Sequence, residues 1–227
     1  MIIIDKKSPL EAKEHLAKID ILMEVETSGI VYEAISGHPD IFFSQIGTQL
    51  IVAPNLPESY FQKLKDEKIS FVLGEEPVGE KYPASSKYNV VADDDYLIHN
   101  FRNTDSVITQ LVDDMDLIQV DQGYTRCNLI PLGYKHYITS DKGIERTLKR
   151  YDVEVLYVDP EGIRLSGYKH GFIGGCAGIK GKQIFFMGSL DHLKNSQEIK
   201  EFLKTQNFEV IELYKGPLFD GGSIIFL

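Results

Sequence analysis

The sequence predicts an α/β fold, namely a closed propeller of five units that each have the order strand, strand, helix, strand. Short apolar runs typical of strands alternate with amphipathic helical segments, and the whole pattern recurs about every 45 residues. The fifth copy joins residues 218–227 to residues 1–23, so that the last strand can pair beside the first and leave no open end of the array. We therefore expect a single domain over residues 1–227, and its four uninterrupted units are 38–74, 89–120, 127–158 and 171–213.

The expected helices carry start signals as well as apolar faces. In the split unit, Ser8 stands at a capping position, Pro9 follows at the first helical position, and Glu11 lies three residues after the cap. Further start signals stand at 55–57, at Ser140 or Asp141, and at 195–198. The apolar faces of the five helices are, in chain order, Ala12, Leu16 and Ile19; Tyr60, Phe61 and Leu64; Val107, Ile108 and Leu111; Ile144 and Leu148; and Ile199, Phe202 and Leu203.

The expected strands are short apolar runs bounded by turn residues. In the split unit, residues 218–227 supply the opening strand, and residues 1–23 supply the other two strands with the helix between them. The remaining strands are expected at 41–43, 50–53 and 69–73; at 89–92, 96–99 and 117–120; at 129–130, 136–139 and 153–158; and at 172–173, 183–187 and 208–213.

Two other architectures share part of this pattern. A doubly wound α/β protein also alternates strands and helices, but it has one strand for each helix rather than a strand pair, a helix and a strand. An all-β propeller has a similar period, but its four-stranded blades leave no place for five amphipathic helices. The five-unit α/β propeller accounts for both features.

Composition and charge limit the expected partners and location. The 227 residues include 24 Lys and Arg against 34 Asp and Glu, which gives a net charge of −10. A chain of this charge repels phosphate backbones and acidic membrane surfaces, so neither a nucleic acid nor a membrane is an expected partner. No apolar run approaches the roughly 20 residues of a membrane span, and the start at Met1 lacks the features of a secretion signal. We expect a cytoplasmic protein.

The motifs predict neither a metal site nor a cofactor. The two cysteines, Cys127 and Cys176, lack the paired spacing of a zinc site and are interpreted as free thiols. The acidic runs 93–95 and 113–114 suit exposed turns, because they lack the spacing of a calcium loop. The sequence also has no phosphate loop, no HExxH and no GxSxG motif.

Three turns, at 37–42, 171–178 and 219–223, combine glycines with residues that can carry chemistry. In these turns and in the order of its units, the whole chain resembles the pentein superfamily of guanidino-group-modifying enzymes, which includes amidinotransferases and deiminases. The resemblance implies a central channel where a cysteine attacks an amidine carbon, a histidine moves protons and carboxylates hold the guanidinium. The implied catalytic residues are Cys176, His38 and His170, and the implied substrate-binding residues are Asp40, Asp220, Gly174 and Gly175.

The chain departs from the pentein pattern at the nucleophile. Catalytic penteins usually take this cysteine from the last unit, whereas residues 220–227 contain none and Cys176 stands one unit earlier. Cys176 and Cys127 are equally compatible with small buried core residues. Asp220 and the pair of His38 and Asp40 are also compatible with turn formation.

Two functions of different classes remain open. The first is a thiol-dependent hydrolase or transferase acting on a small cationic guanidino or amidine compound in the central channel. The second is a catalytically silent pentein that binds a ligand or a protein partner, in the manner of the ribosome anti-association initiation factor, which the chain resembles in fold and length. Neither function requires a cofactor, and fold alone does not choose between them.

Overall fold

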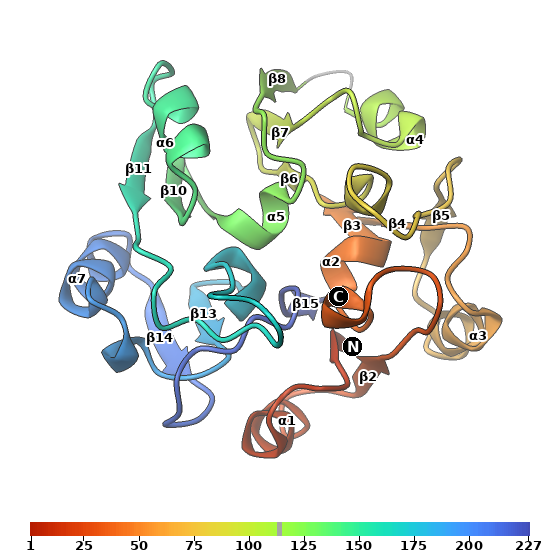
Figure 1. Cartoon of the computed structure of the whole chain (residues 1–227), viewed down its shortest axis with the longest axis horizontal. Coiled ribbons are helices and arrows are strands. Elements are labelled where there is room, and N and C mark those ends of the chain that lie inside the picture. The colour runs from red at the N-terminus through yellow and green to blue at the C-terminus, as the bar shows by residue number, and fades with distance from the viewer. Residues whose placement is uncertain (113–114) are drawn as a thin grey trace.

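The computed structural model describes residues 1–112 and 115–227, so the expected acidic turn at 113–114 lies outside the described residues. In the described residues the strands form five sheets of three strands each, which lie around a common centre (Figure 1). In this part of the chain no strand is shared between two sheets, so the five sheets remain separate. One sheet combines two strands within residues 2–25 with a strand at 225–226, so it joins the two ends of the chain as the sequence predicts.

Four sheets have the order strand, strand, helix, strand along the chain, and in the fifth the first strand of this order comes from the end of the chain. The first two strands pair antiparallel, and the last two pair parallel across the intervening helix. In spatial order, the sheets contain β15 (Ile225–Phe226), β1 (Ile2–Asp5) and β2 (Leu22–Val25); β3 (Phe43–Ile46), β4 (Gln49–Val52) and β5 (Phe71–Leu73); β6 (Val91–Ala92), β7 (Tyr96–His99) and β8 (Asp116–Gln119); β9 (Leu129–Gly133), β10 (His136–Thr139) and β11 (Glu154–Tyr157); and β12 (Ala177–Lys180), β13 (Gln183–Phe186) and β14 (Glu209–Glu212).

Two groups of helices differ in position. The crossover helices lie at the periphery, whereas the short helices α2 and α5 lie near the centre (Figure 1). The crossover helices are α1 (Leu10–Leu16), α3 (Glu58–Asp66), α4 (Ser106–Gln110), α6 (Lys142–Leu148) and α7 (Ser196–Thr205); the other helices are α2 (Pro39–Phe42), α5 (Thr125–Asn128) and the 3-10 helices η1 (Glu33–Ile35), η2 (Ala84–Ser86), η3 (Gly174–Cys176) and η4 (Leu190–His192).

The helix starts agree only in part with the expected capping residues. The Asp141 carboxylate caps α6 by accepting hydrogen bonds from two backbone amides, and Asp105 caps α4 in the same way with one. The expected cap at Ser8 is wrong, because α1 begins after Pro9 and has no side-chain cap. Ser8 is buried instead.

Two of the expected opening strands, 41–43 and 172–173, begin too early. Pro39 has the fixed φ that favours the first turn of a helix, so α2 forms and β3 begins only at Phe43. In the fourth unit a 3-10 turn follows residue 173, and β12 begins at Ala177. A helical turn before the first strand is therefore a feature that the apolar pattern conceals.

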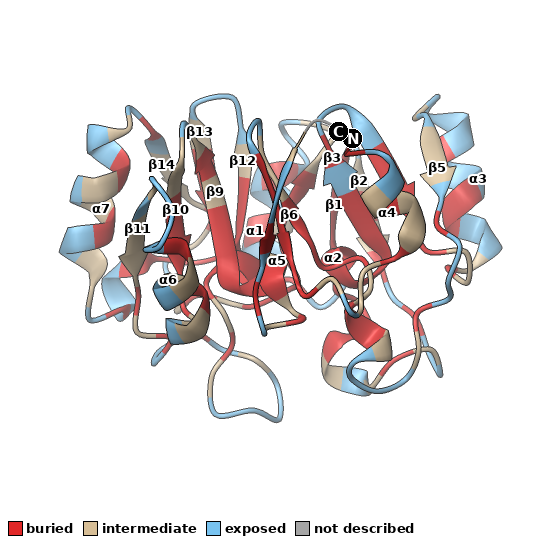
Figure 2. Cartoon of the chain, turned by 90° about the horizontal axis from the view of Figure 1, so that it is seen from above, coloured by how far each residue is buried: buried red, intermediate tan, exposed pale blue. Residues whose placement is uncertain are grey.

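The middle strand of each sheet forms the core. Strands β1 and β7 are buried along their full length, and β4, β10 and β13 are buried except at their first residue. Such strands have continuous apolar sequences because both of their faces are covered. The peripheral helices bury one side and expose the other (Figure 2). In the described part of the chain, none of the helices has the length and apolarity needed to cross a membrane.

Candidate functional site

The turns that precede the first strands meet at the centre of the molecule. Hydrogen bonds join each of these turns to its neighbours, and they include bonds between segments far apart in the sequence. The connecting bonds run from Asp40 N to Gly222 O (3.1 Å), from Asn89 Nδ2 to Asp40 O (3.0 Å), from Arg126 N to Asn89 O (3.0 Å), from Arg126 Nη1 to Gly174 O (3.0 Å) and from Ser223 N to Gly175 O (2.8 Å).

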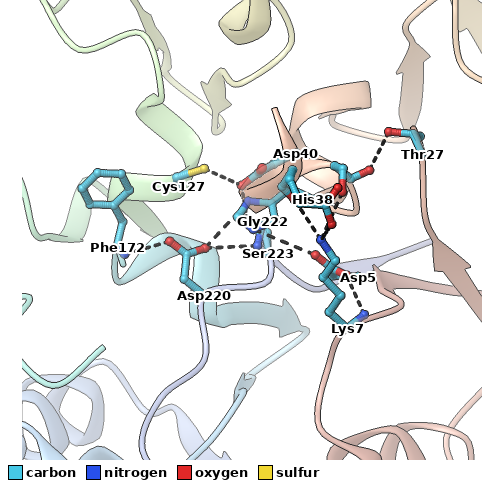
Figure 3. Close-up of polar contacts among 12 residues, drawn as sticks. Asp5, Lys7, Thr27, His38, Asp40, Cys127, Phe172, Asp220, Gly222 and Ser223 are labelled. Carbon is cyan, nitrogen blue, oxygen red and sulfur yellow. Dashed lines mark hydrogen bonds and ion pairs between the residues drawn. The ribbon is translucent and has the colours of Figure 1, made fainter. Parts of the chain in front are cut away.

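Asp40 accepts several hydrogen bonds in this central region (Figure 3). The Cys127 thiol donates to Asp40 Oδ2 at 3.1 Å, and the Ser223 hydroxyl donates to the same oxygen at 2.8 Å. The Asn89 amide donates to the Cys127 sulfur at 3.3 Å. All four side chains belong to residues that are at most 4% exposed. These bonds are therefore shielded from water and orient the thiol toward the carboxylate.

His38 lies between two further buried carboxylates. Its Nε2 is 4.0 Å from Asp5 Oδ2, and its Nδ1 is 4.0 Å from Asp220 Oδ1. Among the described residues, neither ring nitrogen has a hydrogen-bond partner, and the same is true of Asp5 Oδ2 and Asp40 Oδ1. Buried polar atoms are nearly always paired. Four unpaired atoms at and around one histidine are typical of a ligand site.

Burial also changes the pKa values of His38 and of the carboxyl groups around it. It raises the pKa of Asp220 to about 7, with a smaller contribution from the negative charge of Asp40, and it raises the pKa of Asp5 to about 6. It lowers the pKa of His38 to about 4, so the imidazole is neutral at neutral pH. In the described part of the chain, no Lys or Arg side chain forms an ion pair with these three carboxylates. The site is therefore rich in carboxylates, and the charge of the partly buried Arg126 acts on both Asp40 and Cys127.

The Cys127 thiol shares this environment. Burial and the negative charges of Asp40 and Asp220 raise the pKa of Cys127 above its ordinary value, so the thiol is protonated at neutral pH. A further positive charge placed nearby would favour the thiolate and lower this pKa. Cys127, His38 and Asp40 are also the described residues whose donor atoms lie close enough together for a metal ion.

Two cavities reach the buried group. One, of about 650 Å³, is lined by Asp5 and Asp220, and its walls include Tyr32 and Tyr168. The centroids of these two rings are 6.1 Å apart. The other, of about 620 Å³, is lined by Asp40. The first cavity is therefore lined by the two residues whose carboxyl pKa values are raised.

Three of the residues singled out in the sequence lie together here, namely His38, Asp40 and Asp220. The structure does not place Cys176 with them. Cys176 is fully buried in an apolar cluster, and its thiol donates to Phe172 O at 3.2 Å. Burial raises the pKa of this thiol above its ordinary value as well. Its surroundings are those of a core residue.

His170 and the two glycines also differ from the expected roles. The Nδ1 atom of His170 is 3.1 Å from Gly171 O, and its ring packs edge-on against the ring of Phe172. A Cβ on Gly174 would lie 2.1 Å from a backbone oxygen of Arg126, and one on Gly175 would lie 1.9 Å from Asp220 Oδ1. Both glycines therefore make room for groups of the protein itself.

Sequence reasoning missed Asp5, Cys127 and Ser223. The repeat contains a signal for two of them, because Cys127, Gly175 and Ser223 each lie two residues before the first strand of their unit. Cys176 lies one residue later in that register. Asp5 has no such signal, since it ends the apolar strand β1.

Comparisons with known proteins extend over nearly the whole chain. A family model described as "Family of unknown function (DUF6873)" matches residues 3–225. SxtG, an amidinotransferase from Microseira wollei in the saxitoxin biosynthetic pathway, is similar in structure with a TM-score of 0.55 and 11% identity, over 95% of this chain and 88% of that one. No curated protein matches the sequence.

Two further solved structures have the same fold. A DDAH mutant from Pseudomonas aeruginosa in complex with citrulline has a TM-score of 0.53 and 9% identity, over 95% of this chain and 91% of that one. The C. jejuni agmatine deiminase has a TM-score of 0.54 and 11% identity, over 93% and 74%. At these identities the likeness shows the fold, which is the pentein fold that the sequence predicts.

Proposed function

The chain belongs to DUF6873, a family of unknown function, and for this member we propose a thiol-dependent hydrolase or transferase that acts on a small guanidino or amidine compound. The observation that carries the proposal is the group of three buried carboxylates around the neutral His38. Asp5, Asp40 and Asp220 are each 1% exposed and have no Lys or Arg ion pair in the described residues. A small cation is the ligand that these unpaired carboxylates would bind.

A guanidinium or amidinium ion fits this site better than a simple ammonium ion. It is planar and presents N–H donors in a fixed arrangement, which allows two-point hydrogen bonding to carboxylates. Asp5 and Asp220 are assigned to hold the cation, since both line the 650 Å³ cavity and both face His38. Gly175 keeps Asp220 in position by leaving space for its carboxylate.

Cys127 is assigned as the nucleophile in place of Cys176. Its thiol proton passes to Asp40, to which it is already hydrogen-bonded, and the sulfur forms a bond to the central carbon of the guanidinium. The tetrahedral adduct then expels one nitrogen as a neutral amine or ammonia, which leaves with the proton that His38 transfers from Asp40. The amidino carbon stays bound to sulfur.

The second step decides between the two reaction types. In a hydrolase, water attacks the amidino carbon, the C–S bond breaks, the thiol is restored and one proton is released. In a transferase, the amine of a second substrate attacks instead. Binding of the cation also prepares the first step, because its charge opposes the carboxylates that raise the pKa of Cys127.

The similar structures support the same class of reaction. They include an amidinotransferase, an agmatine deiminase and a DDAH in complex with citrulline. We also propose that the five units close into a ring and form one domain over residues 1–227. The hydrogen bonds between neighbouring turns, together with the bond from Leu227 N to Met1 O at 3.0 Å, support this closure.

The alternative is a binding module without catalysis. It is favoured by the burial of Cys127, which is 4% exposed and has a raised pKa. In that case the carboxylates hold a guanidino ligand, or a cationic side chain of a protein partner, and the thiol stays unreactive.

Alkylation separates these alternatives. We expect chloroacetamidine, a cationic alkylator, to attach once to the native protein at a rate at least about 10-fold above that of neutral chloroacetamide. Intact-mass measurement should show the label lost in Cys127→Ser and kept in the matched variant Cys176→Ser. Equal rates for the two reagents, or a label on Cys176, would contradict the enzymatic proposal, and a native protein that takes no label would favour the binding module.

A further inference from the structure

We propose that His38, Asp40 and Cys127 form a binding site for a divalent metal ion of the zinc type. A ring nitrogen of His38, a carboxylate oxygen of Asp40 and the sulfur of Cys127 lie within 4.8 Å of one another, and all three residues are buried. The inference goes beyond the proposed function and does not depend on it, since it concerns the ion alone. The sequence predicts no metal site because Cys127 comes from a different unit than His38 and Asp40.

The donor atoms are available to an ion. Both ring nitrogens of His38 and Asp40 Oδ1 have no hydrogen-bond partner among the described residues, although each residue is only 1% exposed. Leaving buried polar atoms unpaired costs free energy, and coordination removes that cost. Cys127 Sγ is 3.1 Å from Asp40 Oδ2, the oxygen that already accepts from the thiol. The donor atoms of the three residues lie within 4.8 Å of one another, compared with roughly 3.3–3.8 Å between ligands of a tetrahedral zinc ion.

The chemistry of the donors favours zinc over the common hard cations. Mg²⁺ and Ca²⁺ prefer ligand sets made of oxygen, whereas one nitrogen, one oxygen and one thiolate sulfur suit Zn²⁺ and its spectroscopic substitute Co²⁺. Three protein ligands leave the fourth tetrahedral position to a water molecule. Formation of the metal–sulfur bond releases the Cys127 thiol proton to solvent, so one proton leaves for each ion bound.

The surrounding residues can orient all three ligands. Whichever ring nitrogen of His38 binds the ion, the other faces a carboxylate oxygen 4.0 Å away, on Asp5 or on Asp220. A carboxylate that moves to hydrogen-bond distance of a metal-bound histidine would fix its tautomer and orientation. Ser223 donates to the Asp40 carboxylate, and the Asn89 amide donates to the Cys127 sulfur.

The negative charge of the site favours a divalent ion. Asp5, Asp40 and Asp220 have no Lys or Arg ion pair in the described part of the chain. A Cys127 thiolate would add a further negative charge beside Asp40, where the partly buried Arg126 supplies one positive charge. An ion at this position uses the thiol that the proposed reaction needs. Zn²⁺ should therefore also protect Cys127 from alkylation.

Titration of the metal-free full chain with Co²⁺ tests the site directly, with no guanidino compound present. We expect one equivalent of Co²⁺ to produce a sulfur-to-cobalt charge-transfer band in the near ultraviolet and the intense visible bands of tetrahedral cobalt. One equivalent of Zn²⁺ should remove both. Cys176→Ser should keep the spectrum.

Two variants of similar size to the native residues test the ligands. Cys127→Ser should lose the charge-transfer band, because a hydroxyl cannot produce it, and His38→Gln should weaken Co²⁺ binding by at least about 100-fold. Circular dichroism checks that both variants are folded. A native protein without the band, or a band that persists in Cys127→Ser, would overturn the proposal.

Discussion

Asp220→Asn is expected to weaken the binding of methylguanidine at pH 8 on the order of 100-fold, because it removes one charge of a buried pair. Methylguanidine is the smallest probe that keeps the planar cation. At pH 8 Asp220 is largely ionised, since its pKa is raised to about 7. An Asn side chain keeps an acceptor for the Phe172 amide, which now donates to Asp220 Oδ2 at 2.8 Å. Isothermal titration calorimetry gives the affinity.

A matched control separates a local effect from a general loss of negative charge. Asp191 is exposed and forms an ion pair with Lys200, so it does not belong to the group of buried carboxylates. Asp191→Asn should leave the affinity for methylguanidine unchanged within about twofold. Equal effects of the two substitutions, or no effect of Asp220→Asn, would remove Asp220 from the binding site.

Gly175→Ala is expected to lower the free energy of unfolding by about 2–3 kcal/mol, because it overpacks the centre of the molecule. The new Cβ would lie 1.9 Å from Asp220 Oδ1. That carboxylate is fixed by backbone amides of Phe172 and Gly222, so it cannot move without breaking hydrogen bonds. Urea denaturation gives the change, and methylguanidine binding should be lost with it.

Two further variants show whether the collision with Asp220 is the cause. Gly47 has a φ of +57 and nothing within 4 Å of the position of a Cβ, so Gly47→Ala should lower stability by about 1–2 kcal/mol through backbone strain alone. Asp220→Ala removes the colliding oxygen, so the double variant with Gly175→Ala should be more stable than the sum of the single changes implies. Strict additivity would argue against the collision.

The order of elements could be predicted from the sequence because each middle strand is an apolar run and each crossover helix has an apolar face. The turns before the first strands could not be predicted as well. Residues 39–42 are apolar apart from Asp40, and they form α2 instead of a strand because of Pro39. At these residues the preference of Pro39 for the first turn of a helix outweighs the apolar pattern that favours a strand.

The site could be predicted only in part, because most of its residues lie in these turns before the first strands. His38, Asp40 and Asp220 stand in turns that are visible in the sequence. The choice between the cysteines depends on a single residue of register, since Cys127 lies two residues before its strand and Cys176 one. That shift turns one side chain toward Asp40 and the other into an apolar cluster. Only three-dimensional packing distinguishes them.

The central claim is that the buried carboxylates bind a guanidinium cation, and the pH dependence of methylguanidine binding tests it most directly. Burial raises the pKa of Asp5 to about 6 and that of Asp220 to about 7, so both carboxyl groups are protonated in acid and the cation competes with those protons. His38 is neutral above pH 5, because its pKa is lowered to about 4, and the Cys127 thiol stays protonated because its pKa is raised.

Calorimetric titrations at pH 5, 6, 7 and 8 should therefore show affinity that rises about tenfold or more per pH unit between pH 5 and 6, less steeply to pH 7, and then levels off. Proton release, measured from buffers of different ionisation enthalpy, should accompany binding near pH 6. Affinity that is independent of pH, or no binding of methylguanidine at millimolar concentration, would contradict the account.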